Sequence, residues 1–272
     1  MTASPSPIKI GILGCAGRMG RMLLAEVLDE PRCRLAGGTL GPEVALAGRD
    51  LGELAGRDPL GLAAGGEAAD LFRAADAVID FTRPEASSLH AALAATHGKA
   101  LVLGTTGLDA SQRQALQEAA AKTAIVFAPN MSLGVNLLLG LVRKVAASLG
   151  PDYDIEIVEM HHRHKRDAPS GTALELGRAA AAGRDQPLEE LWVKSRDGDT
   201  GPRASGSIGF ATLRGGDVVG EHSVIFAAEG ERLELTHKAS DRRVFARGAL
   251  RAALWAATRP PGLYGMGDVL GL

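Results

Sequence analysis

The stretch IKIGILGCAGRMGRMLLAEVLDE, residues 8–30, decides the fold class. The apolar run at 8–13 is typical of a buried strand, and residues 21–30 have the apolar spacing of a helix. Between them, glycines at 14, 17 and 20 form a G-x-x-G-x-x-G pattern. Strand, glycine turn and helix in this order favour the first unit of a parallel α/β sheet.

The glycine pattern itself predicts dinucleotide binding. Glycine lets the chain leave the strand without a Cβ clash and lets the backbone approach a pyrophosphate closely. The following helix N-terminus then points its N–H groups at that anion, and Arg18 is placed to add a phosphate contact. The alternative is a merely tight strand–helix turn in a glycine-rich chain. The order of strand, turn and helix favours the dinucleotide.

The rest of the first half repeats the alternation of strand and helix. Strands are predicted at 33–39, 77–81, 100–104 and 124–128, and helices at 84–98 and 109–122. Pro84 stands in the first turn of one helix and Gly98 just past its end, while Asp109 is a cap candidate for the other. This pattern predicts a Rossmann-like parallel sheet with right-handed crossovers.

The second half has a different pattern. A helix at 132–150, a strand at 154–160 and a helix over TALELGRAAA precede three strand-like runs, which are 206–216, 218–228 and 231–239. Residues 215–217 and 229–230 are predicted hairpin turns. We expect a smaller α+β domain with a mixed or antiparallel sheet, then a last helix at about 240–258.

These elements predict two domains. Residues 1–129 and 241–272 are expected to form the dinucleotide-binding domain, with the final helix folding back onto it. Residues 130–240 are expected to form a substrate-binding and oligomerisation domain. Residues 1–7 are expected to be a disordered start.

Composition excludes several classes of partner. The chain has 272 residues, 46% of them hydrophobic, and a net charge of −2, so no global field attracts nucleic acid or anionic lipid. Its two cysteines, Cys15 and Cys33, are too few for a disulfide framework. We find no secretory signal and no apolar run long enough to span a membrane, and we expect a cytoplasmic protein.

The end of the second predicted strand leaves the choice of nucleotide open. An acidic residue that would hold a ribose 2′-OH is missing there, where the chain has Thr39-Leu40-Gly41-Pro42, and the nearest carboxylate is Glu43. Phe81-Thr82-Arg83-Pro84 and Gly104-Thr105-Thr106-Gly107 follow two further strands at the same edge. They suit a nicotinamide and its ribose, although Thr82 alone is better interpreted as a helix cap.

A second segment, EMHHRHKRDAPSGTALELG at 159–177, concentrates histidines and basic residues ahead of a helix. A zinc site would need cysteines or a helical H-E-x-x-H, and neither is present, so no metal is predicted. A solvated basic loop is the stronger alternative. Against it, Ser170-Gly171-Thr172 opens a helix and forms an anion seat, which Lys165 can complete. With a histidine as proton donor, the segment predicts a site for a small carboxylic acid that accepts a hydride and a proton.

These motifs together resemble the 4-hydroxy-tetrahydrodipicolinate (dihydrodipicolinate) reductase family over nearly the whole chain. The motifs are GCAGRMGR, FTRPEA, GTTG, APNMSLGVN, EMHHRHKRDAPSGTA, GFATLRGGDVVGEH and ERLELTHKASDRRVFARGALRAALW. The resemblance implies reduction of 4-hydroxy-tetrahydrodipicolinate to tetrahydrodipicolinate by NADH or NADPH, with loss of water, in diaminopimelate and lysine biosynthesis. It also implies a cytoplasmic homotetramer assembled through the C-terminal sheets.

The resemblance implies a role for individual residues. His161 would be the proton donor and Lys165 a second catalytic cation, and Arg242 would lie near the site. The substrate would be held by His162, Ser170, Gly171 and Thr172. The cofactor would be held by Gly14, Cys15, Ala16, Gly17, Arg18, Met19, Gly104, Thr105, Thr106, Ala128, Pro129, Asn130 and Met131.

The sequence departs from the family pattern at Leu40-Gly41, where the family often has an acidic residue, sometimes followed by arginine. The choice between NADH and NADPH therefore stays open. Pro129 is a smaller departure. Two other functions stay open as well. One is an amino-acid-pathway dehydrogenase for another acid, and the other is a non-catalytic dinucleotide sensor whose histidines dock a partner.

Overall fold

The structure is a computed structural model, and it describes residues 6–41 and 45–272. Most of the predicted disordered start, and Glu43, lie outside the described residues. Contacts divide the chain into two compact units, which we describe separately. Unit 1 comprises Met1–Leu133 and Arg243–Gly271, and unit 2 comprises Gly134–Arg242 with Leu272.

Unit 1 is built on a six-stranded sheet whose pairs are all parallel, in the order β11-β5-β4-β3-β1-β2. The predicted parallel α/β architecture is therefore confirmed. The strands are β1 (Ile8–Leu13), β2 (Cys33–Gly38), β3 (Ala77–Asp80), β4 (Ala100–Leu103), β5 (Ala124–Phe127) and β11 (Gly262–Tyr264).

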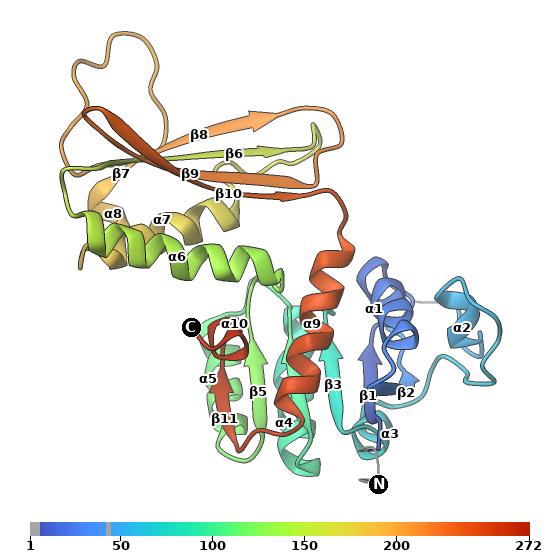
Figure 1. The fold of residues 1–272 in the computed structure, drawn as a ribbon. Helices are drawn as coiled ribbons and strands as arrows, with labels where there is room; N and C mark the ends of the chain where they lie inside the picture. The colour runs from blue at the N-terminus through green and yellow to red at the C-terminus, as the bar shows by residue number, and fades with distance from the viewer. Residues whose placement is uncertain (1–5, 42–44) are drawn as a thin grey trace, which may run out of the picture. The chain divides into compact units, whose positions relative to one another are not determined.

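Helices cover both faces of this sheet (Figure 1). One face packs on α1 (Arg18–Asp29), α9 (Arg243–Ala256) and α10 (Met266–Leu270), with α2 (Leu51–Leu54) beside them. The other packs on α3 (Ala68–Ala74), α4 (Pro84–His97) and α5 (Ala110–Ala120). Consecutive strand residues alternate between the two cores, which is why these strands read as continuous apolar runs.

Helix ends in unit 1 follow the sequence signals, with one exception. Pro84 begins α4, Gly98 closes it in the left-handed conformation, and Asp109 forms a capping box with Gln112 on α5. The interpretation of Thr82 as a helix cap is wrong. The N-cap of α4 is Arg83, and the Thr82 hydroxyl instead donates to Asp80 Oδ1 over 2.6 Å, because that buried carboxylate lies only two residues back.

Unit 2 contains a five-stranded mixed sheet in the order β10-β9-β6-β8-β7, as predicted for a smaller α+β domain. Its strands are β6 (Asp154–His161), β7 (Trp192–Val193), β8 (Ile208–Arg214), β9 (Gly220–Ala228) and β10 (Glu231–Ala239). The helices α6 (Leu133–Leu149), α7 (Gly171–Gly183) and α8 (Leu188–Leu191) share one hydrophobic core with β6, β8 and β9.

One of the two predicted hairpins in unit 2 is wrong. The chain at 215–217 does not join neighbouring strands, because β6 lies between β8 and β9 and pairs parallel with one and antiparallel with the other. The turn signal is real, since Gly216 has a φ of 53°, but it opens a crossover past the end of β6. The hairpin at 229–230 is confirmed by the antiparallel pairing of Ala228 with Glu231.

The alternation of β6 positions the candidate site. Ile155 and Ile157 point into the core of unit 2, and Glu159 and His161 continue the same buried stripe. On the flanking strands, Glu159 is paired with Thr212 and with His222, and His161 is paired with Arg214. The row of apolar side chains on this face therefore ends in a row of polar ones.

Candidate active site

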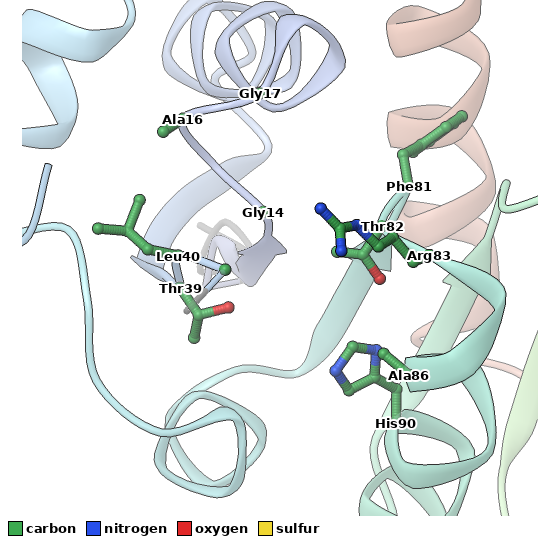
Figure 2. A pocket seen from close by; sticks show the side chains of 11 residues that line it. Gly14, Ala16, Gly17, Thr39, Leu40, Phe81, Thr82, Arg83, Ala86 and His90 are labelled. Carbon is green, nitrogen blue, oxygen red and sulfur yellow. The ribbon is translucent and has the colours of Figure 1, made fainter. Parts of the chain in front are cut away.

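Unit 1 has a pocket of about 420 Å³ at the carboxyl ends of its strands. It lies where the strand order reverses around β1, the place where open α/β sheets bind ligands. Figure 2 shows Ala16, Thr39 and Leu40 on one wall and Arg83 and His90 on the other. The lining residues are Gly14, Ala16, Gly17, Thr39, Leu40, Gly41, Phe81, Thr82, Arg83, Ala86 and His90.

Two positions of the glycine loop require glycine. Gly14 has a φ of +68°, and a Cβ at Gly20 would lie 2.3 Å from the Gly14 carbonyl oxygen. The Gly17 N–H donates to that same oxygen over 3.0 Å. The loop therefore holds strand β1 and helix α1 in the tight turn that a pyrophosphate site requires.

The predicted cofactor residues differ in their surroundings. Gly14, Ala16 and Gly17 line the pocket, whereas Cys15 is buried beneath it and Arg18 is exposed. Burial raises the pKa of the Cys15 thiol to about 11, so the group is a neutral packing residue. Met19 is half-buried on the first turn of α1.

The remaining cofactor candidates follow β4 and β5 at the same edge of the sheet. A Cβ at Gly104 would lie 2.3 Å from the Phe81 ring, so this position also fits only glycine. The Thr105 hydroxyl is buried and has no hydrogen-bond partner within the described part of the chain. A buried hydroxyl in that state suits a polar ligand atom. Ala128, Pro129, Asn130 and Met131 follow β5, and of these Ala128 and Met131 are buried.

A buried pair beside the pocket was not predicted. Asp80, at the end of β3, accepts a hydrogen bond from the Thr82 N–H over 2.8 Å and lies 2.7 Å from His90 Nδ1. Asp80 is fully buried, and the His90 side chain on helix α4 contacts its carboxylate. The pair fixes the loop after β3 that carries Arg83.

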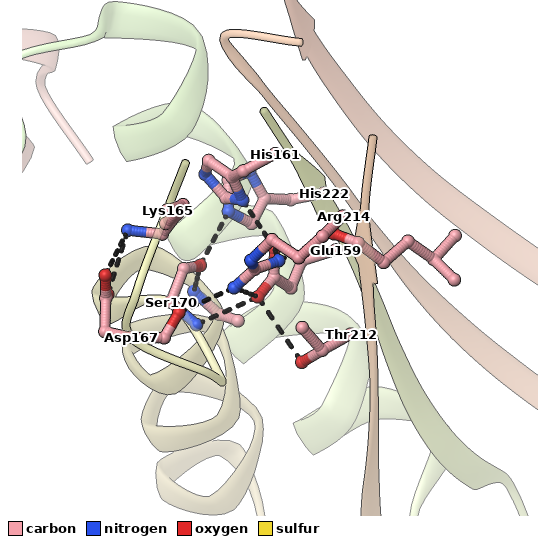
Figure 3. Close-up of polar contacts among 10 residues, drawn as sticks. Glu159, His161, Lys165, Asp167, Ser170, Thr212, Arg214 and His222 are labelled. Atoms are coloured by element: carbon pink, nitrogen blue, oxygen red, sulfur yellow. Dashed lines mark hydrogen bonds and ion pairs between the residues drawn. The ribbon is translucent and has the colours of Figure 1, made fainter. Parts of the chain in front are cut away.

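In unit 2, the polar row on β6, β8 and β9 forms one connected cluster (Figure 3). His161 Nδ1 donates to Glu159 Oε2 over 2.5 Å. Arg214 grips both oxygens of Glu159, at 2.9 Å each, and the Ser170 N–H donates to Oε1 over 3.1 Å. Glu159 is therefore a buried carboxylate surrounded by donors.

These donors decide the charge of Glu159. Burial alone would raise the pKa of its carboxyl, but the hydrogen bonds and charges of His161 and Arg214 outweigh burial and lower the pKa to about 2. The group is thus an anion at neutral pH, although only 1% of its surface is exposed. A buried carboxylate of this kind needs such partners to be stable.

His222 connects the cluster to helix α7. Its Nε2 lies 3.1 Å from Ser170 Oγ, and its ring meets the His161 ring edge-on at 5.1 Å between centroids. Burial, helped by the charge of His161, lowers the pKa of His222 to about 4. His222 is therefore neutral at physiological pH.

Helix α7 begins beside this cluster. Ser170 is its N-cap, and the Ser170 hydroxyl accepts a hydrogen bond from the Ala173 N–H over 3.2 Å. The first N–H groups of a helix have no carbonyl partner within it, so the Gly171 end of α7 is suited to an anion. Lys165 lies in the preceding loop, where its Nζ is held 2.8 Å from Asp167 Oδ1.

The other basic candidates lie around this site. His162 is half-buried, and partial desolvation, followed by the charge of Arg242, lowers its pKa. Arg163, His164 and Arg166 are exposed. The described residues contain no group of three or more His, Cys, Asp or Glu side chains arranged to hold a metal ion.

The pKa of His222 predicts how stability depends on pH. Its folded pKa of about 4 is below the ordinary 6.5, so the unfolded chain binds the extra proton between these values. Folding with a neutral His222 is therefore not penalised above pH 6.5. As the pH falls toward 4, the free energy of unfolding decreases by about 2 to 3 kcal/mol.

Urea unfolding of the wild type and of His222→Gln at pH 7.5 and pH 5 measures this effect. We expect the variant to lose less stability than the wild type over that interval. Equal losses in the two proteins would contradict the assignment. The carboxyl of Glu159 does not interfere, because its own window lies between pH 4.5 and about 2.

Sequence reasoning missed Arg214, His222 and the role of Glu159. Glu159 and His161 have the spacing of one strand face, and this signal was available in the alternation of DIEIVEMH. Arg214 and His222 lie more than fifty residues further along the chain, and only the pairing register brings them to the same place.

Comparison with known proteins adds independent information. Residues 8–131 match the family model "Dihydrodipicolinate reductase, N-terminus", and residues 134–270 match "Dihydrodipicolinate reductase, C-terminus". A 4-hydroxy-tetrahydrodipicolinate reductase of Ruegeria pomeroyi is 55% identical over 97% of this chain and 98% of its own length. One of Magnetococcus marinus is 52% identical, with the same coverage of both chains.

Solved structures support the fold. A "Dipicolinate bound Dihydrodipicolinate reductase" from Paenisporosarcina sp. TG-14 superposes with a TM-score of 0.78 at 24% identity, covering 96% of this chain and 99% of that one. An amine dehydrogenase from Mycobacterium smegmatis superposes with a TM-score of 0.64 at 15% identity, covering 95% and 94%. None of the described helices is both long and apolar enough to span a membrane.

Proposed function

The chain belongs to the dihydrodipicolinate reductase family, and on that premise we propose how its two units carry out the family's reaction. It is an NAD(P)-dependent oxidoreductase of diaminopimelate and lysine biosynthesis, a 4-hydroxy-tetrahydrodipicolinate reductase. The single observation that carries the proposed mechanism is the Glu159–His161 pair beside the N-terminus of α7.

Unit 2 binds the dicarboxylate substrate. One carboxylate accepts hydrogen bonds from the backbone N–H groups of Gly171 and Thr172, where the helix dipole favours negative charge. Lys165 supplies a cation to the substrate, and Asp167 orients its ammonium group until then. The dipicolinate named with the Paenisporosarcina relative is a dicarboxylate of the same class.

His161 supplies the proton that the reduction consumes. Because Nδ1 donates to Glu159, Nε2 is the nitrogen left to face the substrate. Gly220 keeps that side open, since a Cβ there would lie 3.0 Å from His161 Nε2. Ser170 connects the proton-donor pair to the substrate-binding helix. Its N–H donates to Glu159, and its side chain caps α7, the helix that binds the substrate carboxylate.

Unit 1 binds the nicotinamide cofactor, which supplies the hydride. The fit is supported by the tight turn at Gly14 and Gly20 and by the buried Thr105 hydroxyl. We assign the pyrophosphate to the loop of Gly14, Cys15, Ala16, Gly17, Arg18 and Met19. We assign the remaining cofactor contacts to Gly104, Thr105, Thr106, Ala128, Pro129, Asn130 and Met131.

We propose that the enzyme accepts both NADH and NADPH. The described lining of the pocket contains no carboxylate that would repel a 2′-phosphate, because Leu40 and Gly41 stand at the end of β2. Arg83 on the opposite wall favours an added negative charge. Side-by-side titration is expected to give dissociation constants within about tenfold of each other, which corresponds to 1.4 kcal/mol. A hundredfold preference for either nucleotide would contradict this proposal.

The test of the function is an absorbance assay. The purified protein with 4-hydroxy-tetrahydrodipicolinate should oxidise NADH or NADPH, and a panel of semialdehydes and keto acids should not replace the substrate. Turnover of another acid alone would favour a related dehydrogenase. Nucleotide binding without any turnover would favour a sensor. The homotetramer and the cytoplasmic location stay predictions, and light scattering measures the first of these.

A further inference from the structure

Arg214 occupies an unusual place beside the proton donor. Its Nη1 and Nη2 each lie 2.9 Å from an oxygen of Glu159, so the guanidinium makes a bidentate contact with the carboxylate. The same oxygen that Nη1 contacts, Oε2, accepts the hydrogen bond from His161 Nδ1. Arginine and histidine therefore compete for the charge of a single buried carboxylate.

This competition has a chemical consequence. A histidine whose only ionic partner is a buried carboxylate holds its proton tightly, which makes it a poor acid. A permanently charged guanidinium on that carboxylate weakens the attraction between the carboxylate and the protonated imidazole, so the histidine releases its proton more readily. The low pKa of Glu159, about 2, reflects both cations, after burial has acted in the opposite direction.

Arg214 also holds the loop that carries Lys165. Its Nη2 donates to the Asp167 backbone oxygen over 2.6 Å, and Asp167 in turn binds Lys165 through its side chain. The residue thus contacts both the partner of the proton donor and the loop of the second cation, although it comes from β8, more than forty residues away.

We propose that Arg214 is a positioning residue that sets the acidity of His161 through Glu159 and fixes the 162–169 loop. The proposal rests on the proposed function, since it concerns the same proton transfer. Three observations on the Arg214 side chain support it. The guanidinium contacts both oxygens of Glu159, it shares Oε2 with His161, and it donates to the backbone oxygen of Asp167.

The other charges around His161 come from every neighbouring element. Glu159 is on β6 and Arg214 on β8, and His222 on β9 is neutral and packs against the ring. His162 and Lys165 lie in the loop that follows β6, and their charges reach the histidine cluster. Of these groups, Glu159 and Arg214 are in the direct hydrogen-bonded chain.

The experiment is an NMR titration of the assigned His161 ring in the full-length, ligand-free protein, compared among the wild type, Arg214→Gln, Arg214→Lys and Glu159→Gln. We expect the midpoint to rise by about one pH unit in Arg214→Gln and to fall in Glu159→Gln, because one change removes a nearby cation and the other an anion. Arg214→Lys keeps the charge and should remain closer to the wild type than Arg214→Gln does.

Kinetics give a second readout. The pH at which kcat falls on the alkaline side should move up in Arg214→Gln and stay near the wild-type value in Arg214→Lys. If Arg214 only supported the fold, its replacement would lower activity or stability without raising the His161 midpoint. The opposite shifts expected in Arg214→Gln and Glu159→Gln would then not be observed.

An unmoved midpoint in a folded Arg214→Gln protein, or shifts of the same sign in Arg214→Gln and Glu159→Gln, would overturn the proposal. Should Arg214→Gln fail to fold, the same titration of Arg214→Met decides the matter: a raised midpoint supports the proposal and an unmoved midpoint overturns it. The titration needs no substrate, so its outcome is separate from the absorbance assay. Absence of nicotinamide oxidation by the wild type would refute the proposed function alone.

Discussion

Replacing His161 with glutamine is expected to lower kcat by about 10²- to 10⁴-fold, the usual contribution of a general acid. The glutamine amide keeps a donor for Glu159 and fills the buried space, so the loss isolates the missing proton. The dissociation constant for NADPH should remain near its wild-type value, because His161 belongs to unit 2 and the nucleotide pocket belongs to unit 1. Steady-state turnover and a fluorescence titration of NADPH measure the two quantities.

His164→Gln is the matched control for this experiment. His164 is in the same basic segment, is exposed and is assigned no part in the reaction. We expect it to retain wild-type kcat. A His161→Gln enzyme that turns over at the rate of the His164→Gln enzyme would remove His161 from the mechanism.

Replacing Gly20 with alanine is expected to cause the second large effect, on stability and cofactor binding together. The new Cβ would lie 2.3 Å from the Gly14 carbonyl oxygen and 2.7 Å from two backbone atoms of Cys15. Because these neighbours are backbone, the glycine loop itself must move. Overpacking of this kind costs about 1 to 3 kcal/mol, and the displaced loop should bind NADH and NADPH much more weakly.

Gly267→Ala is the control, since Gly267 lies in helix α10 and a Cβ there would have no atom within 4 Å. Urea unfolding and nucleotide titration of both variants give the comparison. A Gly20→Ala protein as stable as Gly267→Ala, with unchanged nucleotide affinity, would show that the loop tolerates a side chain.

The sequence predicted the parallel sheet of unit 1 closely, and the reason is local. Residues 8–13 form β1 with the predicted bounds, and the other predicted strands differ by one residue at their ends. Most of these strands are short apolar runs, and helices α4 and α5 carry proline, glycine and aspartate signals at their ends. Such signals do not depend on distant pairing.

Two features that depend on distant pairing were not predicted correctly. Strand β11 has only three residues and is a strand because it pairs with β5. The hairpin predicted at 215–217 failed for the same reason, because β6, from fifty residues earlier, takes the place between β8 and β9. Sequence patterns indicate that a strand is present, whereas the sheet order comes from packing that no local signal records.

In the candidate site, the residues of one continuous segment were predicted, whereas the residues that strand pairing brings to it were not. The segment 159–177 contains the histidines, Lys165 and the start of α7 in one continuous stretch, and its composition pointed to an anion site. Glu159 was read only as part of a strand, and Arg214 and His222 as ordinary strand residues. Their roles depend on the register of β6 with β8 and β9, which the structure supplies.

The most direct test of the central claim is a crystal structure of this protein with dipicolinate. The account predicts one carboxylate hydrogen-bonded to the backbone N–H groups of Gly171 and Thr172, with the ring within reach of His161 Nε2. Dipicolinate bound elsewhere, with the start of α7 and His161 Nε2 both facing bulk solvent, would contradict it.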